Sequence, residues 1–105
     1  MSTEYEQDVV EEQLTEEAAD TAEEPPYKVL IHNDDVTPMD FVVGILLKIF
    51  KLMLPDAEQV MLVAHFRGIA YVQTLPKSEA QKRVGRAHFA ANLEGYPLKF
   101  TVEPE

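Results

Sequence analysis

The longest apolar stretch of this sequence limits the folds open to the chain more than any other feature. It covers residues 38–54, and after Asp40 only Gly44, Lys48 and Lys51 interrupt it. A helix that crosses a bilayer needs about 20 apolar residues, so this stretch is too short and too interrupted to span one. We therefore expect residues 38–54 to form one helix, buried on most of its surface, at the centre of a small core.

The segment just before this stretch gathers hydrogen-bond acceptors in a short turn. Asn33, Asp34 and Asp35 are turn-forming residues that would end a preceding strand at His32. Two carboxylates and an amide oxygen then project from one loop, and such a group of acceptors suits a cation. The alternative is that these residues serve only the turn.

The expected helix has its own start signal. Thr37 suits the N-cap, Pro38 suits the first helical position, and Asp40 completes a capping-box pattern with Thr37. We therefore expect Thr37 to cap the helix and to hold the acidic turn rigid at its second end.

Hydrophobic periodicity predicts three strands and two further helices around this centre. Strands are expected at residues 27–32, 69–74 and 97–102, and helices at residues 56–66 and 76–93. Gly68 and Gly95 follow these two helices at positions where glycine commonly ends a helix. The order β-α-α-β-α-β predicts an α+β fold with helices packed on a small three-stranded sheet.

The charge of the chain is concentrated near its N-terminus. Of the 19 acidic residues, ten lie within residues 1–25, which hold none of the nine lysines and arginines, and the net charge is −10. We expect residues 1–24 to be a disordered acidic extension, with at most a weak helix over residues 9–19. Residues 25–105 form the core domain, whose balanced charge argues against binding to nucleic acid.

Several classes of chemistry lack the residues that they need. The chain has no cysteine, which excludes disulfides and thiolate sites and fits a reducing cytosol. We see no signal peptide, no Gly-x-Ser-x-Gly around Ser2 or Ser78, no His-x-x-x-His pair and no calcium-loop spacing after Asp34. We expect no enzymatic activity, no cofactor and no metal.

One histidine has two interpretations. His65 shares the apolar face of the helix at residues 56–66 with Met61 and Ala64. A lone histidine on such a face is usually a hydrogen-bonded core residue. If this helix packs beside the start of the preceding one, His65 could instead face Asn33 and Asp35.

Several blocks of the sequence, taken together over residues 26–103, resemble the ClpS adaptor family. The blocks, in the family's order and spacing, are His32-Asn33-Asp34-Asp35, Thr37-Pro38-Met39-Asp40-Phe41-Val42-Val43, Met61-Leu62 with His65 and Gly68, and Tyr96-Pro97-Leu98. The resemblance implies a fold shared with the C-terminal domain of the bacterial ribosomal stalk protein. It also implies a non-enzymatic adaptor that brings proteins with N-terminal Leu, Phe, Tyr or Trp (N-degrons) to a ClpA- or ClpC-type AAA+ unfoldase, without nucleic acid or membrane partners.

The resemblance also assigns site residues. By this resemblance, the α-amino group of the substrate would be held by Asn33, Asp34, Asp35 and His65. The first side chain of the substrate would be enclosed by Thr37, Pro38, Met39, Val42, Met61, Ala64 and Leu98. An α-ammonium has only donors to offer, and amide oxygen, carboxylate and neutral imidazole nitrogen can accept them.

Two departures from the family's pattern affect these expectations. Ala64 stands where the family usually has Val, and residues 73–83 differ around the surface that docks on the unfoldase. In this segment Ser78 stands where the family commonly has an acid, and Arg83 stands where it commonly has Lys. We expect both residues to take part in docking. The family implies the cytoplasm of a bacterium, with the plastid stroma less favoured. The alternative function is a structural or assembly module of stalk-like fold that does not read an N-terminus.

Overall fold

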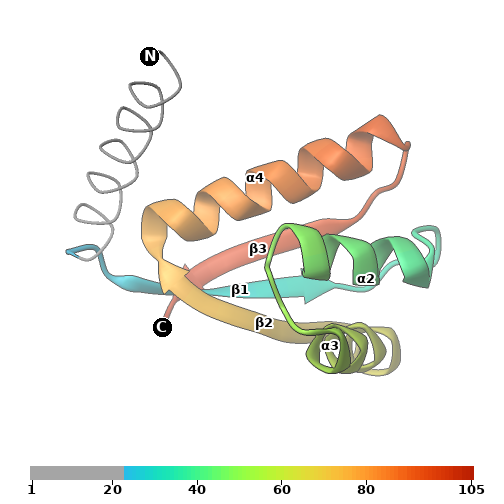
Figure 1. Cartoon of the computed structure of the whole chain (residues 1–105), viewed down its shortest axis with the longest axis horizontal. Coiled ribbons are helices and arrows are strands. Elements are labelled where there is room, and N and C mark those ends of the chain that lie inside the picture. The colour runs from blue at the N-terminus through green and yellow to red at the C-terminus, as the bar shows by residue number, and fades with distance from the viewer. Residues whose placement is uncertain (1–22) are drawn as a thin grey trace, which may run out of the picture.

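The computed structural model describes residues 23–105, which form three strands and three helices (Figure 1). The elements in chain order are β1 (Pro26–His32), α2 (Met39–Lys48), α3 (Leu54–Arg67), β2 (Ile69–Pro76), α4 (Lys77–Leu93) and β3 (Lys99–Pro104). This order confirms the predicted β-α-α-β-α-β α+β fold. The expected disordered extension, apart from its last two residues, and the weak helix over residues 9–19 lie outside the described residues.

The sheet has β1 at its centre, with β2 and β3 paired to it on either side in antiparallel register. The helices α2 and α4 lie over one face of this sheet, while α3 crosses at the end of β2 (Figure 1). The inward-facing Val29 and Ile31 of β1 alternate with more exposed neighbours. This alternation is the pattern of a strand with one covered face.

The core lies between the sheet and the helices. Its largest fully buried side chains are Phe50, Ile31, Leu46 and Val29, and the ring of Phe50 stacks on that of Phe100 with 4.9 Å between centroids. The inner face of α4 consists of small residues, Ala80, Ala87 and Ala91, all fully buried. Helix α4 thus packs on the sheet through alanines, as the sequence predicted.

The prediction of one helix over residues 38–54 is wrong. Helix α2 ends at Lys48, and Lys51 adopts the left-handed conformation with φ of 61°. The amides of Phe50 and Leu52 donate back to the carbonyls of Ile45 and Leu46, which closes the helix while Phe50 enters the core. The apolar run therefore serves two helices and a buried turn. Among residues 23–105, no helix is both long and apolar enough to cross a membrane.

The predicted N-cap is also wrong. Helix α2 begins at Met39, and its N-cap residue, Pro38, makes no side-chain capping bond. The N–H and the hydroxyl of Thr37 donate instead to the carboxylate of Asp34. A hydrogen bond to an ionised carboxylate is stronger than one between neutral groups, so the Thr37 hydroxyl is oriented toward Asp34 and does not cap the helix. Asp40 accepts from the N–H of its neighbour Phe41, so no capping box forms. Gly68 and Gly95 do end their helices with positive φ, as predicted.

Candidate functional site

A pocket of about 280 Å³ opens where the end of β1, the loop of residues 33–38 and helix α3 meet. The fold brings every residue of the two sequence-assigned substrate groups to this pocket, and Ile31, His32 and Val36 line it as well. Sequence reasoning did not assign these three. Ile31 was expected only as a strand residue, and His32 as the end of that strand and part of a block that resembles the family. Nothing in the sequence distinguished Val36 from its loop neighbours.

The interior of the pocket is apolar. Val42 from α2, Ala64 from α3 and Leu98 from the segment before β3 are all buried, and Met61 is half-buried beside them. Met39, at the start of α2, is 44% exposed. The volume is near the lower end of ligand pockets, which hold about 300–1,000 Å³. Such a space suits one apolar side chain.

The mouth of the pocket is polar and open to solvent. Asn33, Asp35 and His65 are exposed and line the pocket. Among residues 23–105, none of these three side chains makes a hydrogen bond, although the His65 ring meets the Phe66 ring edge-on at 5.0 Å. The interpretation of His65 as a hydrogen-bonded core residue is therefore wrong. Three acceptors remain available to a ligand that offers donors.

Asp34 has a different place in the loop. Its Oδ1 accepts the backbone N–H groups of Val36 at 2.9 Å and Thr37 at 2.6 Å, and its Oδ2 accepts the Thr37 hydroxyl at 2.9 Å. Partial burial alone would raise the pKa of Asp34, but the hydrogen bonds from Thr37 and Val36 outweigh it and lower that pKa below 3.8. Asp34 thus fixes the conformation of the loop through the three hydrogen bonds that it accepts.

A backbone bond joins the two sides of the mouth. The N–H of Asn33 donates to the carbonyl of Gly68 at 2.9 Å. Gly68 is the residue that ends α3, and its φ of 89° is open to glycine but strained for other residues. The loop that carries Asn33 and Asp35 is therefore held against the end of the helix that carries His65.

Charged and imidazole groups in residues 23–105 do not gather into a metal site, since no group of three or more lies close enough to hold an ion. The polar groups at the open mouth of the pocket are oxygen acceptors and the imidazole of His65, while the His32 ring is paired with the Thr101 hydroxyl. This arrangement can receive a donor-rich cationic group while its apolar interior holds a side chain.

The structure does not bring Ser78 and Arg83, the residues assigned to docking, to this pocket. Ser78 lies in the first turn of α4, where the N–H of Lys77 donates to the Pro25 carbonyl beside the beginning of β1. The pocket lies at the other end of β1, and a strand of seven residues spans about 20 Å. Any docking through Ser78 would thus occur far from the substrate pocket.

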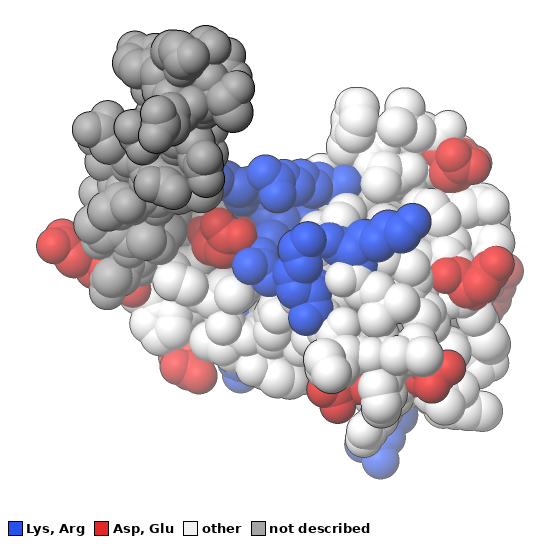
Figure 2. All heavy atoms as spheres, in the orientation of Figure 1, with Lys and Arg blue, Asp and Glu red and all other residues white. Residues whose placement is uncertain are grey.

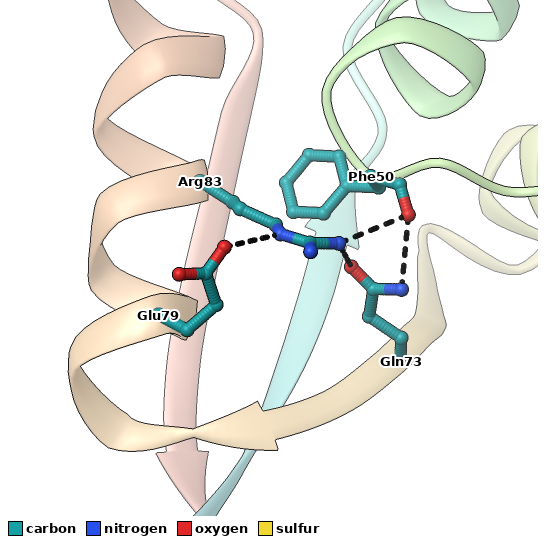
Figure 3. Close-up of polar contacts among 4 residues, drawn as sticks. All are labelled: Phe50, Gln73, Glu79 and Arg83. Atoms are coloured by element: carbon teal, nitrogen blue, oxygen red, sulfur yellow. Dashed lines mark hydrogen bonds and ion pairs between the residues drawn. The ribbon is translucent and has the colours of Figure 1, made fainter. Parts of the chain in front are cut away.

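Arg83 is held inside the protein by three elements (Figure 3). Its Nε donates to Glu79 Oε2 at 2.8 Å, and its Nη1 donates to the Phe50 carbonyl at 3.3 Å and to Gln73 Oε1 at 3.2 Å. The Gln73 amide also donates to the Phe50 carbonyl, at 3.1 Å. Arg83 therefore joins α4 to β2 and to the buried turn after α2, a structural use that the sequence did not reveal.

Comparison with known proteins identifies the family. Residues 22–101 match the family model described as ATP-dependent Clp protease adaptor protein ClpS. The chain belongs to the ClpS adaptor family. ClpS proteins are adaptors, not enzymes, so the family confirms the expectation of a non-catalytic protein.

Individual ClpS proteins agree with this membership. The chain is 39% identical to the ClpS of Desulfatibacillum aliphaticivorans over 92 residues, which cover 88% of each protein. It is 46% identical to ClpS 2 of Mesorhizobium japonicum over 79 residues, 75% of this chain and 78% of that protein. The solved structure of Agrobacterium tumefaciens ClpS2 bound to L-phenylalaninamide is 36% identical, has a TM-score of 0.74 and covers 77% of this chain and 98% of that one.

Proposed function

We propose that this chain is a ClpS adaptor that binds proteins through a free N-terminal Leu, Phe, Tyr or Trp and presents them to the Clp protease. One observation carries the proposal: an apolar pocket sized for one side chain is also lined by three exposed acceptors that have no hydrogen-bond partner within residues 23–105. The residue at the N-terminus of a protein has this same pairing of an α-ammonium and a side chain on one carbon.

The comparison with Agrobacterium ClpS2 supports the same ligand chemistry. That protein was solved bound to L-phenylalaninamide, which has a free α-amino group and an amide in place of a carboxylate. It therefore imitates the first residue of a peptide chain. In our proposal Asn33, Asp35 and His65 accept from the α-ammonium, Asp34 shapes the loop beside them, and the apolar interior encloses the side chain.

The chemistry explains why a free N-terminus would be preferred. Hydrogen bonds to a charged group contribute about 1.5–3 kcal/mol each, and burial of a Leu or Phe side chain contributes about 1.5–3 kcal/mol. Acetylation removes the positive charge and leaves one amide N–H in place of three ammonium donors. The acceptors at the mouth would then face a larger, neutral group that cannot satisfy them.

The decisive experiment compares peptides that differ only at the N-terminus. We expect a fluorescent peptide that begins with Phe to bind at least about tenfold more tightly than its N-acetylated form, a difference of about 1.4 kcal/mol or more. A peptide with Ala before the Phe is the matched control, because it keeps the free N-terminus and the Phe side chain but moves that side chain to the second position. A stalk-like assembly module would bind all three alike or none of them, and either result would reject the proposal.

Delivery is the second half of the proposed function. We propose a ClpA- or ClpC-type AAA+ unfoldase as the partner and the bacterial cytoplasm as the compartment, in line with the bacterial relatives. Purified unfoldase and peptidase should degrade a Phe-initiated reporter faster when the chain is added. If addition leaves degradation unchanged while the peptide still binds, the chain recognises N-termini without serving that protease.

A further inference from the structure

Strand β3 begins directly after a residue of the pocket wall and is held by histidines from two other elements. Leu98, which lines the pocket and is 6% exposed, comes one residue before β3. The N–H of Phe100 donates to Nε2 of His88 on α4 at 2.9 Å. From β1, Nε2 of His32 forms a hydrogen bond with Oγ1 of Thr101 at 2.8 Å. Both bonds fix the chain within three residues of Leu98.

The two histidine bonds differ in how they depend on protonation. A backbone N–H can only donate, so the bond from Phe100 requires a neutral His88 ring with its proton on Nδ1 and a free lone pair on Nε2. A protonated ring has donors at both nitrogens, and this bond would then be lost. A hydroxyl both donates and accepts, so Thr101 can pair with His32 in either charge state. Only the His88 bond therefore requires a neutral imidazole.

The Phe100 N–H has no strand partner that could replace His88. Phe100 stands opposite Ile31 of β1, and in an antiparallel pair the N–H groups of alternate residues point away from the partner strand. Within residues 23–105 the sheet ends at β3, so no further strand lies on this side. Phe100 is 2% exposed, and a buried donor left without an acceptor is unfavourable. His88 thus supplies the acceptor that another strand would have provided.

The charged groups near His88 do not pair with it. Within residues 23–105 His88 takes part in no ion pair, and the nearest charged residue on α4, Arg86, is exposed. Figure 2 shows lysines and arginines gathered on the surface over α4 and the adjoining end of α2. Residues one turn away from His88 on α4 are uncharged: Val84, Gly85, Ala91 and Asn92. Among the strands packed on α4, β2 has no charged residue, and the charged or titratable side chains of β1 and β3 alternate with the inward-facing ones: Lys28, His32, Lys99 and Glu103.

We propose that His88 is a positioning residue for the pocket, which holds the Leu98 wall in place only while its ring is neutral. Leu98 lies between two anchors. Before it, the Tyr96 ring meets the Phe41 ring edge-on at 4.9 Å, and after it the Phe100 N–H is fixed by His88. His88 itself does not line the pocket, so it acts through β3. This inference rests on the proposed recognition of N-termini and adds a pH dependence to it.

The bond can be observed in the full-length protein without any substrate. NMR coupling across the hydrogen bond, between the amide nitrogen of Phe100 and Nε2 of His88, should be present near pH 8. It should disappear near pH 5.5, because histidine takes up its second proton within about this range. Coupling that persists near pH 5.5, or that is absent near pH 8, would overturn the inference.

Two substitutions separate the acceptor from the bulk of the ring. His88→Gln keeps an acceptor that does not titrate, whereas His88→Leu keeps apolar bulk and removes the acceptor. Near pH 8, His88→Leu should bind a Phe-initiated peptide about threefold to tenfold more weakly, the loss expected for one neutral hydrogen bond, while His88→Gln should bind like the parent. Gln81→Leu, at an exposed position of α4, is the matched control and should leave the affinity unchanged. A folded His88→Leu variant with parental affinity would overturn the inference.

The pH profile of binding separates His88 from His65. Between about pH 8 and pH 5.5 the parent should lose affinity through both rings, because a protonated His65 can no longer accept from an α-ammonium. His88→Gln should lose only the part that belongs to His65, so the ratio of the two affinities should change by about threefold to tenfold. If the parent binds the peptide and this ratio stays constant, the role of His88 alone is rejected. If the parent binds no Phe-initiated peptide at any pH, the proposed recognition of N-termini is rejected and the role of His88 with it.

Discussion

At the level of single residues, Asp35 and His65 test the proposed α-ammonium site most directly. We expect Asp35→Ala or His65→Ala to weaken binding of a Phe-initiated peptide by about tenfold to a hundredfold, because one lost hydrogen bond to a charge costs about 1.5–3 kcal/mol. Thermal unfolding should change little, since both side chains are exposed and make no hydrogen bond within residues 23–105. Glu58→Ala changes an exposed acid on α3 that does not line the pocket, and it is the control in a fluorescence anisotropy titration. Parental affinity in both site variants would reject the assignment.

Asp34 should act through the loop and show a pH signature. Its pKa is lowered in the folded protein, so its contribution to stability is present above about pH 3.8 and is lost as the pH falls through the folded value. We expect Asp34→Ala to unfold at lower denaturant than the parent at neutral pH, with the difference shrinking below pH 3.8. Urea unfolding at several pH values measures it. A difference that stays constant in acid would show that the carboxylate charge is not what holds Thr37.

Ala64 should influence which side chain the pocket prefers. It is 3% exposed and lines the pocket, so Ala64→Val adds volume to the pocket wall. The parent should favour Phe, Tyr and Trp over Leu, and Ala64→Val should move the ratio toward Leu by up to about 1–1.5 kcal/mol, near tenfold. Flexible Met61 can absorb part of this change. Peptides with the four N-terminal residues measure the ratio on both forms, and an unchanged ratio would remove Ala64 from the pocket wall.

At the level of elements, the end of α3 sets the position of the recognition loop. Gly68→Ala should destabilise the fold by about 1–2 kcal/mol, because alanine is strained at a φ of 89° even though no atom lies within 4 Å of its added Cβ. Peptide affinity should fall too, since the Gly68 carbonyl holds the N–H of Asn33.

Gly85→Ala is the matched control for this change. Gly85 lies in the middle of α4 with open space around its Cβ position and without a positive φ, so alanine there should stabilise the fold by about 0.5–1 kcal/mol. Chemical denaturation of both variants gives the comparison. Equal effects of the two substitutions would mean that the backbone conformation of Gly68 is not the cause.

The element order could be predicted from the sequence pattern, and the residues that line the pocket came from the family resemblance, while the connections between elements could not be predicted. Periodicity located the strands and α4, but it treated Phe50 as one more helical residue, because burial of its ring against Phe100 depends on a distant strand. Local capping rules indicated Thr37 as the N-cap, but they do not show that its hydroxyl hydrogen-bonds the Asp34 carboxylate instead of the helix backbone. Arg83 appeared as a surface base, since its partners Phe50 and Gln73 are distant in sequence.

At the level of the whole molecule, Arg83 joins three separate parts of the chain. We expect Arg83→Ala to lower the free energy of unfolding by about 1–3 kcal/mol, because the bonds to the Phe50 carbonyl and to Gln73 are lost in a partly buried place. Glu79→Ala is the control, since it removes only the partly exposed ion pair, which contributes about 1 kcal/mol or less. Urea denaturation compares them. Equal small losses would show that the network adds nothing beyond the ion pair.

The central position of β1 determines how the molecule would respond to tension on its N-terminal end. When the opposing force acts at the pocket, beyond the far end of β1, a pull on the chain before Pro26 acts along the strand, and the backbone bonds to β2 on one side and β3 on the other lie across that direction. These bonds are loaded in shear and must fail together, whereas an edge strand pulled sideways would peel away one bond at a time. The pocket lies beyond the far end of the same strand. Force between the acidic extension and the pocket would therefore load the pairing of β1 with both of its neighbours at once.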